Sequence, residues 1–355
     1  MFNEPVGPLN ILSRYRAGDP ASESAARARR PRVDRLPESA VPAVDACAGF
    51  ARPRRRVFRV TSRLPVVTVT YSPGAHLRTF VETLPAATSR QVGLVMADNG
   101  STDGVPEAVA AEYDFAEFFP TGGNLGYGTA INRAVTEIAR RPDEFDQEFV
   151  LVVNPDVWFE PGSVDALLEA AERWPRGAAY GPQIAETDGS VYPSARSVPR
   201  LGAGIGHAVL GPVWQGNPWT AQYLDDRDMS TERAAGWLSG SCLLLRRSAF
   251  DALGGFDERY FMYLEDVDLG DRLGKAGWQN VYVPSSVIHH DQGHAAKTVP
   301  EFTLRAHHRS AYLFQADRHP HSWQAPIRWA LKAGLEIRCR LAIRSAERAL
   351  RQQNS

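Results

Sequence analysis

The sequence predicts an α/β protein with a mostly parallel sheet that carries helices on both faces. Short apolar runs of strand length alternate with segments in which apolar residues recur at helical spacing. The strand-like runs are continuously apolar, which is typical of strands buried on both faces. Hydrophobic residues make up 43% of the 355 residues and charged residues 23%, so the chain can form a large buried core.

The first half of the chain contains three strands, each followed by a helix. Turn residues such as Ser72-Pro73-Gly74 and Asp98-Asn99-Gly100 end the first two strands. In chain order we expect strand 66–70, helix 77–84, strand 92–97, helix 130–138, strand 149–153 and helix 164–174.

The second half is less regular. Residues 177–235 are rich in Gly, Pro and Trp and are expected to form loops over a site. Beyond them we expect strand 237–246, helix 265–275, strand 281–284 and a helix over 325–352. The chain accordingly divides into an arm (1–62), a catalytic domain (63–298) and a C-terminal helical region (299–355) that associates with a membrane.

The charge distribution separates the arm from the rest. The net charge is −1, yet residues 1–63 carry thirteen Arg against six Asp and Glu. The arm is either a disordered basic tail, an overextended start, or a segment that binds anionic lipid or nucleic acid. The chain as a whole is not basic, which argues against a nucleic-acid-binding function.

Cysteine usage and hydropathy favour a cytoplasmic protein. Cys47, Cys242 and Cys339 are far apart and suggest neither a disulfide framework nor a zinc site. No apolar run reaches the length of about 18 residues that spans a bilayer. The first twenty residues lack the apolar stretch of a secretory signal. The oligomeric state is left open.

Polar side chains follow each of the three early strands. Thr70 and Tyr71 follow the first, Asp98 and Asn99 the second, and Asn154-Pro155-Asp156 the third. Parallel neighbouring strands would bring these residues to one edge, where two carboxylates can bind a nucleotide and a divalent cation on its diphosphate. Strand-terminating turn chemistry is the alternative for any one of them, but three in succession favour a site.

The glycine-rich loop 122–132 leads into a helix. Gly126, Tyr127 and Gly128 would permit close backbone approach to a phosphate at a helix N-terminus, and a flexible turn is the equal alternative. The loop lacks the Gly-Lys-Ser/Thr of a Walker motif, and the first strand is not followed by the GxGxxG of a dinucleotide fold.

The densest cluster of functional side chains lies in residues 254–273. Glu265 and Asp266 are expected in the first turn of a helix, where the helix dipole stabilises a carboxylate while burial opposes its charge. A carboxylate in that position suits a general base, and Asp266 is the stronger candidate. Asp268 and Arg272 have the spacing of an intrahelical ion pair.

Seven of the nine histidines lie between His289 and His321. His289 and His290 follow the last predicted strand, downstream of the acidic helix. One of them could complete a metal site begun by the carboxylates, and a structural role is the alternative.

These motifs together resemble the family-2 glycosyltransferases with a GT-A fold, and more narrowly their rhamnosyltransferase branch. The resemblance rests on Thr-Tyr after the first strand, Asp-Asn-Gly-Ser-Thr-Asp after the second, Asn-Leu-Gly-Tyr-Gly, Asn-Pro-Asp-Val, and Gly-Gly-Phe-Asp-Glu followed by Glu-Asp-Val-Asp-Leu. Blocks 190–196, 207–212, 217–220 and 236–242 extend it. It runs from about residue 64 to 344 and leaves the arm out.

The resemblance implies a substrate pair and roles for several residues. The donor would be dTDP-L-rhamnose and the acceptor a hydroxyl of GlcNAc-diphospho-polyprenol. Asp98 would contact the nucleotide base, Asp156 would bind Mg²⁺ or Mn²⁺, and Asp266 would act as base. Asn154 stands where many members have a first Asp, which makes His289 or His290 more attractive as a ligand. The remaining roles are acceptor contacts at Trp237, Ser239 and Gly240.

The implied reaction is a single displacement that inverts the anomeric carbon. The cation would neutralise charge on the departing dTDP. The alternatives are another family-2 transferase with a different donor or acceptor and, in a different class, a non-catalytic nucleotide-sugar-binding scaffold.

The C-terminal helix is expected to contact the inner face of the cell membrane. Residues 325–351 interleave seven Lys and Arg with apolar side chains, including Trp329. A basic amphipathic helix can lie among lipid headgroups. A helix packed on the catalytic domain with a solvated basic face is the alternative.

Overall fold

The computed structural model describes residues 62–186, 189–199, 229–291 and 300–353. The predicted basic arm lies outside the described residues except for Ser62. Two of the blocks that extend the family resemblance, 207–212 and 217–220, lie outside them as well.

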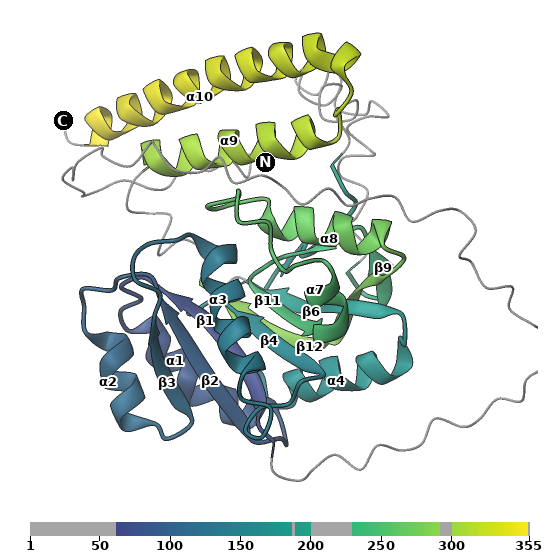
Figure 1. Cartoon of the computed structure of the whole chain (residues 1–355). Helices are drawn as coiled ribbons and strands as arrows, with labels where there is room; N and C mark the ends of the chain where they lie inside the picture. The colour runs from purple at the N-terminus through teal and green to yellow at the C-terminus, as the bar shows by residue number, and fades with distance from the viewer. Residues whose placement is uncertain (1–61, 187–188, 200–228, 292–299, 354–355) are drawn as a thin grey trace, which may run out of the picture. The chain divides into compact units, whose positions relative to one another are not determined.

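The described residues form a large mixed sheet, which confirms the predicted α/β class (Figure 1). Its strands run in the order β3-β2-β1-β4-β11-β6-β12-β5, with β7 (Val191–Tyr192) beside β6 and β9 (Arg233–Ala235) beside β12. The main strands are β1 (Leu64–Thr70), β2 (Val92–Asp98), β3 (Ala116–Pro120), β4 (Phe149–Val153), β5 (Val157–Phe159), β6 (Gly177–Ala185), β11 (Cys242–Arg246) and β12 (Gln279–His290).

Six of these strands point the same way. β3, β2, β1 and β4 are mutually parallel, and β6 and β12 are parallel to each other. β11 runs antiparallel to both β4 and β6, so it joins the two parallel groups without reversing either. The carboxyl ends of β1, β2, β4 and β12 therefore lie along one edge of the sheet.

Helices cover both faces of the sheet. Between the helices and the sheet, each face has its own apolar core. One core contains side chains from α1 (His76–Thr83), α2 (Val105–Glu112) and α4 (Ser163–Arg173). The other contains side chains from α3 (Tyr127–Ala139), α7 (Arg247–Ala252) and α8 (Glu265–Lys275). Leu77, Phe80 and Val81 of α1 are completely buried, as their helical spacing predicts. Full burial of each such side chain is worth about 1.5–3 kcal/mol.

The irregular second half was predicted less well. Residues 177–185, expected to be loop, form the interior strand β6, because they pair with β11 on one side and with β12 on the other. The predicted strand 237–246 is two strands, β10 (Trp237–Leu238) and β11, separated by a turn. β10 pairs with β8 (Ala195–Arg196) in a separate small sheet.

β12 is longer than the predicted strand 281–284. Its pairing with β6 shifts between Val283 and Val287, and Pro284 lies in that interruption. A proline is tolerated in a strand at such an irregularity, where no ladder hydrogen bond is required of it.

The C-terminal region contains two long helices joined by a short 3-10 turn, η2 (Ser322–Gln324). α9 (Pro300–Asp317) and α10 (Ala325–Gln353) lie alongside each other (Figure 1). Ser310 Oγ of α9 donates to the carbonyl of Met262, and Arg318 forms an ion pair with Asp271 of α8 at 2.7 Å. Within the described part of the chain, none of the helices combines the length and apolarity needed to cross a bilayer.

Candidate active site

The predicted residues gather where the carboxyl ends of β1, β2, β4 and β12 meet. Thr70 ends β1 and pairs in register with Asp98, which ends β2. Asp156 follows β4, and His290 ends β12. Ligands of open α/β sheets bind at this edge, so the topology brings the strand-end residues to the expected place.

Asp98 is enclosed by the loop that it begins. Thr70 Oγ1 donates to Asp98 Oδ1 at 2.8 Å, and the amides of Gly100 and Ser101 donate to Oδ2 at 2.9 Å each. The residue is only 4% exposed. Its carboxylate therefore fixes the loop after β2. Tyr71, which follows β1, is 47% exposed at the same end of the sheet.

Asn99 connects that loop to the glycine-rich loop. Its Nδ2 donates to the carbonyl of Gly126 at 3.2 Å, while its Oδ1 accepts from Thr121 Oγ1 at 2.8 Å. Gly126 has φ +82°, and a Cβ there would come within 2.2 Å of the Phe261 carbonyl oxygen. Only glycine fits this close approach.

Tyr127 links the glycine-rich loop to the turn that precedes β11. Its amide donates to the carbonyl of Phe261 at 3.1 Å, and its hydroxyl donates to the carbonyl of Gly240 at 2.6 Å. Gly128 packs closely against Phe256. These contacts make the start of α3 a tightly packed junction.

Asp156 and His290 lie side by side. His290 Nε2 is 3.0 Å from Asp156 Oδ1 and 3.4 Å from Asn154 Nδ2. The pairing of His290 with Val157 and a hydrogen bond from the Asp291 amide to the Asp156 carbonyl hold the two segments together.

His289 is not brought to this pair. Neighbouring residues of a strand point to opposite faces, and His289 Nε2 lies 2.7 Å from Glu160 Oε1. Its ring stacks on Trp158 with centroids 5.1 Å apart. Of the two predicted histidine candidates, the structure places His290 beside Asp156. In the described residues no cluster of three or more His, Cys, Asp or Glu is arranged to hold a metal ion.

Asp266 and Glu265 begin α8 as predicted. Asp266 Oδ2 accepts from the amide of Gly240 at 2.8 Å, and Oδ1 accepts from the amide of Val267 at 2.8 Å. Tyr263 and Leu264, just before the helix, have φ values of +68° and +62°. Non-glycine residues rarely adopt this backbone conformation, and where they do the strain is often at a functional site.

Burial dominates the electrostatics of the acid pair. It raises the pKa of Asp266, an effect opposed by the amides of Gly240 and Val267 and by the Arg196 guanidinium. Burial, and then the charge of Asp266, raise the pKa of Glu265 to about 8. Glu265 Oε2 has no hydrogen-bond partner among the described residues. Glu265 is therefore neutral at pH 7.

The phenol of Tyr127 contacts the turn that also holds Asp266. Its pKa is raised first by burial and then by the charges of Glu265 and Asp266, with Asp156 also contributing. Charges act strongly only over short distances in a protein. The negative charges around the site therefore keep the Tyr127 hydroxyl protonated.

The three predicted acceptor residues lie in β10 and in the turn that joins it to β11. The Ser239 amide donates to the Ser194 carbonyl at 2.8 Å, and its hydroxyl lies 3.1 Å from Ser241 Oγ. Trp237 Nε1 donates to the carbonyl of Ser197. A Cβ added at Gly240 would lie 3.2 Å from Asp266 Cβ. The turn and the candidate base are therefore in close contact.

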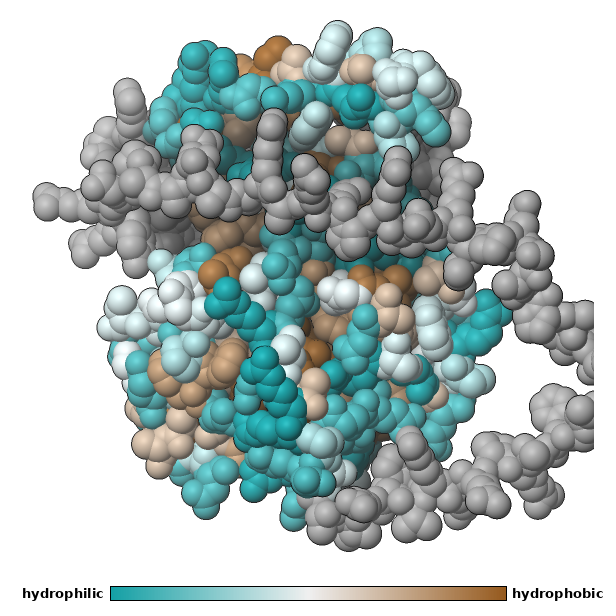
Figure 2. Space-filling model, viewed as in Figure 1, coloured by the Kyte–Doolittle hydropathy of each residue, from teal (hydrophilic) through white to brown (hydrophobic). Residues whose placement is uncertain are grey.

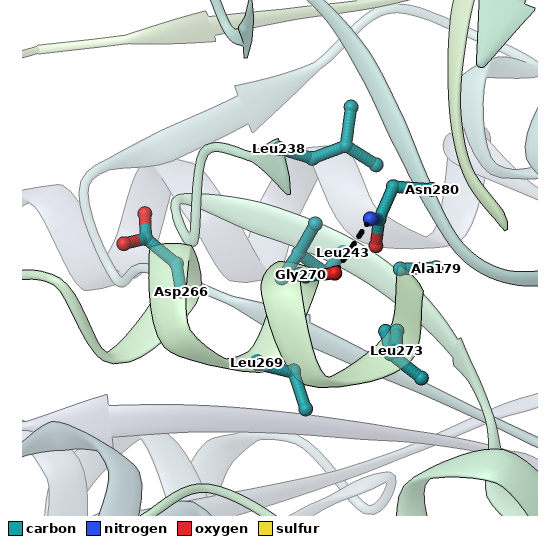
Figure 3. A pocket seen from close by; sticks show the side chains of 8 residues that line it. All are labelled: Ala179, Leu238, Leu243, Asp266, Leu269, Gly270, Leu273 and Asn280. Atoms are coloured by element: carbon teal, nitrogen blue, oxygen red, sulfur yellow. Dashed lines mark hydrogen bonds between the residues drawn. The ribbon is translucent and has the colours of Figure 1, made fainter. Parts of the chain in front are cut away.

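A pocket with no room for a water molecule adjoins this turn beside α8 (Figure 3). Asp266 lies at its end, at the start of the helix, and its carboxyl group is set apart from the other lining side chains (Figure 3). The other lining residues are largely apolar: Ala179, Leu238, Leu243, Leu269, Gly270, Leu273 and Asn280. The pocket is a gap between packed side chains next to the candidate base, and it is not a ligand-binding cavity.

Sequence reasoning gave no role to Arg196, whose charge lowers the pKa of Asp266. Its guanidinium lies over the rings of Tyr192 and Trp237, 5.4 Å and 5.9 Å from their centroids. No spacing rule could have revealed this, because the pairing of Arg196 with Trp237 joins residues 41 positions apart.

The family comparison identifies the class of protein to which this fold belongs. Residues 66–254 match the family model "Glycosyl transferase family 2", and residues 214–331 match "Glycosyl transferase family group 2". The chain belongs to glycosyl transferase family 2, as predicted, and is an enzyme of the glycosyltransferase class.

Individual relatives show which transferases the chain is similar to. The chain is 54% identical over 298 residues to the N-acetylglucosaminyl-diphospho-decaprenol L-rhamnosyltransferase of Mycobacterium tuberculosis (strain H37Rv), covering 83% of this chain and 97% of that one. It is 28% identical to rhamnosyltransferase WbbL of Escherichia coli over 55% of this chain and 72% of the relative. The mannosyltransferase PcManGT of Pyrobaculum calidifontis shares the fold at TM-score 0.50 and 16% identity, over 82% and 75% of the two chains.

Proposed function

We propose that the protein transfers L-rhamnose from dTDP-L-rhamnose to N-acetylglucosaminyl-diphospho-decaprenol, with inversion, in assembly of the linker between peptidoglycan and arabinogalactan. The 54% identity over almost the whole length of the mycobacterial relative supports the substrate pair. The observation that carries the proposal is Asp266, half-buried at the start of α8 and held by the Gly240 amide.

Asp266 is suited to take the proton from the acceptor hydroxyl. Each of its oxygens accepts one amide, and a carboxylate oxygen has a second lone pair for the incoming hydroxyl. The hydroxyl oxygen attacks the anomeric carbon, the bond to dTDP breaks with its electron pair, and the proton passes to Asp266. Neutral Glu265 leaves the single negative charge of the pair on Asp266.

Asp156 and His290 would hold a divalent cation. Their oxygen and nitrogen donors already lie 3.0 Å apart at the strand edge. A protein supply of one carboxylate and one imidazole fits an ion that takes its other ligands from the donor's diphosphate and water. The cation, when bound, neutralises charge that develops on the leaving dTDP.

The enzyme would reach its lipid acceptor by lying on the inner face of the cell membrane. Along η2 and α10, exposed residues recur at alternating spacings of four and three: Trp323, Ile327, Ala330, Gly334, Ile337 and Leu341. Trp323 is 72% exposed, and Ile337 and Leu341 are each 59% exposed. Figure 2 shows hydrophobic side chains among hydrophilic ones on the helix pair, at the top of the view.

The charge of the same helix favours a lipid surface. Arg338, Arg344 and Arg348 are exposed beside the apolar stripe, and basic residues near anionic headgroups each add about 1 kcal/mol to binding. The proposal therefore places the protein in the cytoplasm, attached peripherally. No nucleic acid takes part in it.

A donor panel tests the function. The full chain is incubated with a short-chain prenyl-diphospho-GlcNAc and with dTDP-rhamnose, UDP-sugars or GDP-mannose, each with and without chelator. We expect turnover with dTDP-rhamnose that the chelator abolishes and Mg²⁺ or Mn²⁺ restores. Turnover with another donor instead would favour a different family-2 activity.

Asp266→Asn separates catalysis from a scaffold function. A general base contributes about 10²- to 10⁴-fold, so the variant should lose turnover by that factor and still bind dTDP. Unchanged turnover would show that Asp266 is not the base, and binding without turnover in the unmodified protein would favour the scaffold.

A further inference from the structure

Arg196 is a cation at the site with spare hydrogen-bond donors. It lies in β8, opposite Trp237 of β10, and its Nε donates to the carbonyl of Pro193 at 2.8 Å. Among the described residues, Nη1 and Nη2 have neither a hydrogen-bond acceptor nor an acidic partner. By contrast Arg272 and Arg318, nearby in the same fold, are each paired with an aspartate.

The side chain is held in place by rings. Tyr192 and Trp237 both lie within cation–π distance of its guanidinium. The Trp237 indole is in turn fixed by its hydrogen bond to the Ser197 carbonyl. A stacked guanidinium whose terminal nitrogens remain open presents the planar fork that binds a phosphate group.

Arg196 also lies on the acceptor's side of the candidate base. Trp237 and Gly240 belong to one short segment, and the Gly240 amide contacts Asp266. The guanidinium lowers the pKa of Asp266 against the effect of burial, so the two groups interact. The Asp156–His290 pair, by contrast, is reached from the ends of β4 and β12.

We propose that Arg196 binds the diphosphate of the lipid-linked acceptor. This inference rests on the proposed function, in which a GlcNAc hydroxyl meets Asp266. The diphosphate is attached to the anomeric carbon across that sugar ring, so a cation near the base and beyond the ring would meet it. Its contact would select lipid-diphosphate acceptors over neutral glycosides.

Two acceptors that share GlcNAc test the site: a short prenyl-diphospho-GlcNAc and an alkyl GlcNAc glycoside that lacks the diphosphate. Arg196→Gln should raise the KM of the diphosphate acceptor by roughly 10- to 150-fold, the range for a hydrogen bond to a charged group. The kcat/KM of the alkyl glycoside should fall much less, because it loses only the effect of Arg196 on the pKa of Asp266, and the KM of dTDP-rhamnose should not change.

Two further variants control for folding and charge. Arg196→Lys keeps the charge without the fork and should show a smaller rise in the acceptor KM. Arg176→Gln removes an exposed arginine that contacts the Gly277 carbonyl at the opposite end of β6, and should change nothing.

Other outcomes would overturn the inference. An equal loss with both acceptors, together with an acid limb of the pH profile shifted to higher pH, would mean that Arg196 only keeps Asp266 ionised. A rise in the donor KM would assign the guanidinium to the donor diphosphate. If the unmodified chain does not use dTDP-rhamnose with either acceptor, the proposed function itself fails and the inference fails with it.

Discussion

The backbone amide of Gly240 donates a 2.8 Å hydrogen bond to Asp266 Oδ2. One residue precedes the antiparallel strand β11, and the other begins α8. The contact thus fixes the candidate base against the turn that carries proposed acceptor residues. A substitution at Gly240 is therefore expected to shift the Asp266 carboxylate.

Gly240→Ala should impair turnover. A Cβ at this position would come within 3.2 Å of Asp266 Cβ and 3.4 Å of Oδ2, so the carboxylate must move by a few tenths of an ångström. Misplaced catalytic groups are costly, and we expect kcat to fall by about tenfold or more. Steady-state kinetics check this, with Gly274→Ala, which has open space around it on α8, as the control. Equal kinetics for both variants would contradict the prediction.

Glu265 should make stability decrease as the pH rises. Its pKa is about 8 in the folded protein against an ordinary value of 4.5, so between these values the folded state holds more protons than the unfolded state. The free energy of unfolding then falls with pH, by at most about 1.4 kcal/mol per unit, and levels off above pH 8.

Glu265→Gln should remove that contribution. Urea unfolding at pH 5.5, 6.5 and 7.5 should give a flatter pH dependence for this variant than for the unmodified protein. Glu107→Gln, at an exposed position of α2, serves as the control and should retain the slope. Parallel curves for all three proteins would refute the assignment.

Gly126→Ala should destabilise the fold far more than Gly122→Ala. Both glycines have a positive φ, but a Cβ at Gly126 would meet the Phe261 carbonyl at 2.2 Å, whereas Gly122 has open space. We expect the conformational penalty alone, about 1 kcal/mol, at Gly122, and an additional overpacking cost of about 1–3 kcal/mol at Gly126. Thermal unfolding compares the two, and similar melting temperatures would count against the close contact.

Asp156→Asn and His290→Gln should weaken cation binding, whereas His289→Gln should not. The first two residues lie 3.0 Å apart at the strand edge, and His289 is directed to Glu160. Calorimetric titration of Mn²⁺ in the presence of dTDP should show a loss of about tenfold or more for the first two, because a site with one carboxylate has few protein ligands. A loss in His289→Gln equal to that in His290→Gln would disprove this ligand choice.

Replacing Ile337 and Leu341 together with Gln should weaken binding to anionic vesicles. Each side chain is 59% exposed, and losing the transfer of two such side chains into lipid should reduce affinity by at least about tenfold. Vesicle co-sedimentation measures this, with Ala333→Gln on another exposed position of α10 as the control. If the double variant changed the oligomeric state and left vesicle binding intact, the stripe would instead be a contact between copies of the chain.

The sequence predicted β1, β2 and β4 because these strands are almost completely buried, but it missed α2 and the edge strand β3, whose side chains are only half-buried. Continuous apolar runs such as 149–153 admit few alternatives, and α8 begins at Glu265, so Glu265 and Asp266 lie in its first turn as expected. β6 was missed because Gly177, Gly181 and Pro182 are typical of loops. The neighbouring strands β11 and β12, remote in sequence, provide the pairing that overrides this local preference.

The candidate site was predicted as a set of residues, but not their contacts. Strand-end position sufficed to bring Thr70, Asp98 and Asp156 to one edge. It could not distinguish His289 from His290, because that depends on the alternation of side chains along β12 and hence on its register with β5. The position of Arg196 could not be predicted from the sequence, because it depends on the pairing of β8 with β10 in the small sheet.

The reversed direction of β11 brings a later part of the chain to the strand-end loops of the first half. Because β11 runs against β4, its first residue, Cys242, lies beside the last residue of β4, Val153. The segment entering β11 therefore meets the loops that leave β1, β2 and β4, although it is encoded far downstream of them. Exchange of residues 237–241 alone would thus alter the acceptor contacts, whereas exchange of the whole downstream stretch would also replace His290 and part of the proposed cation site.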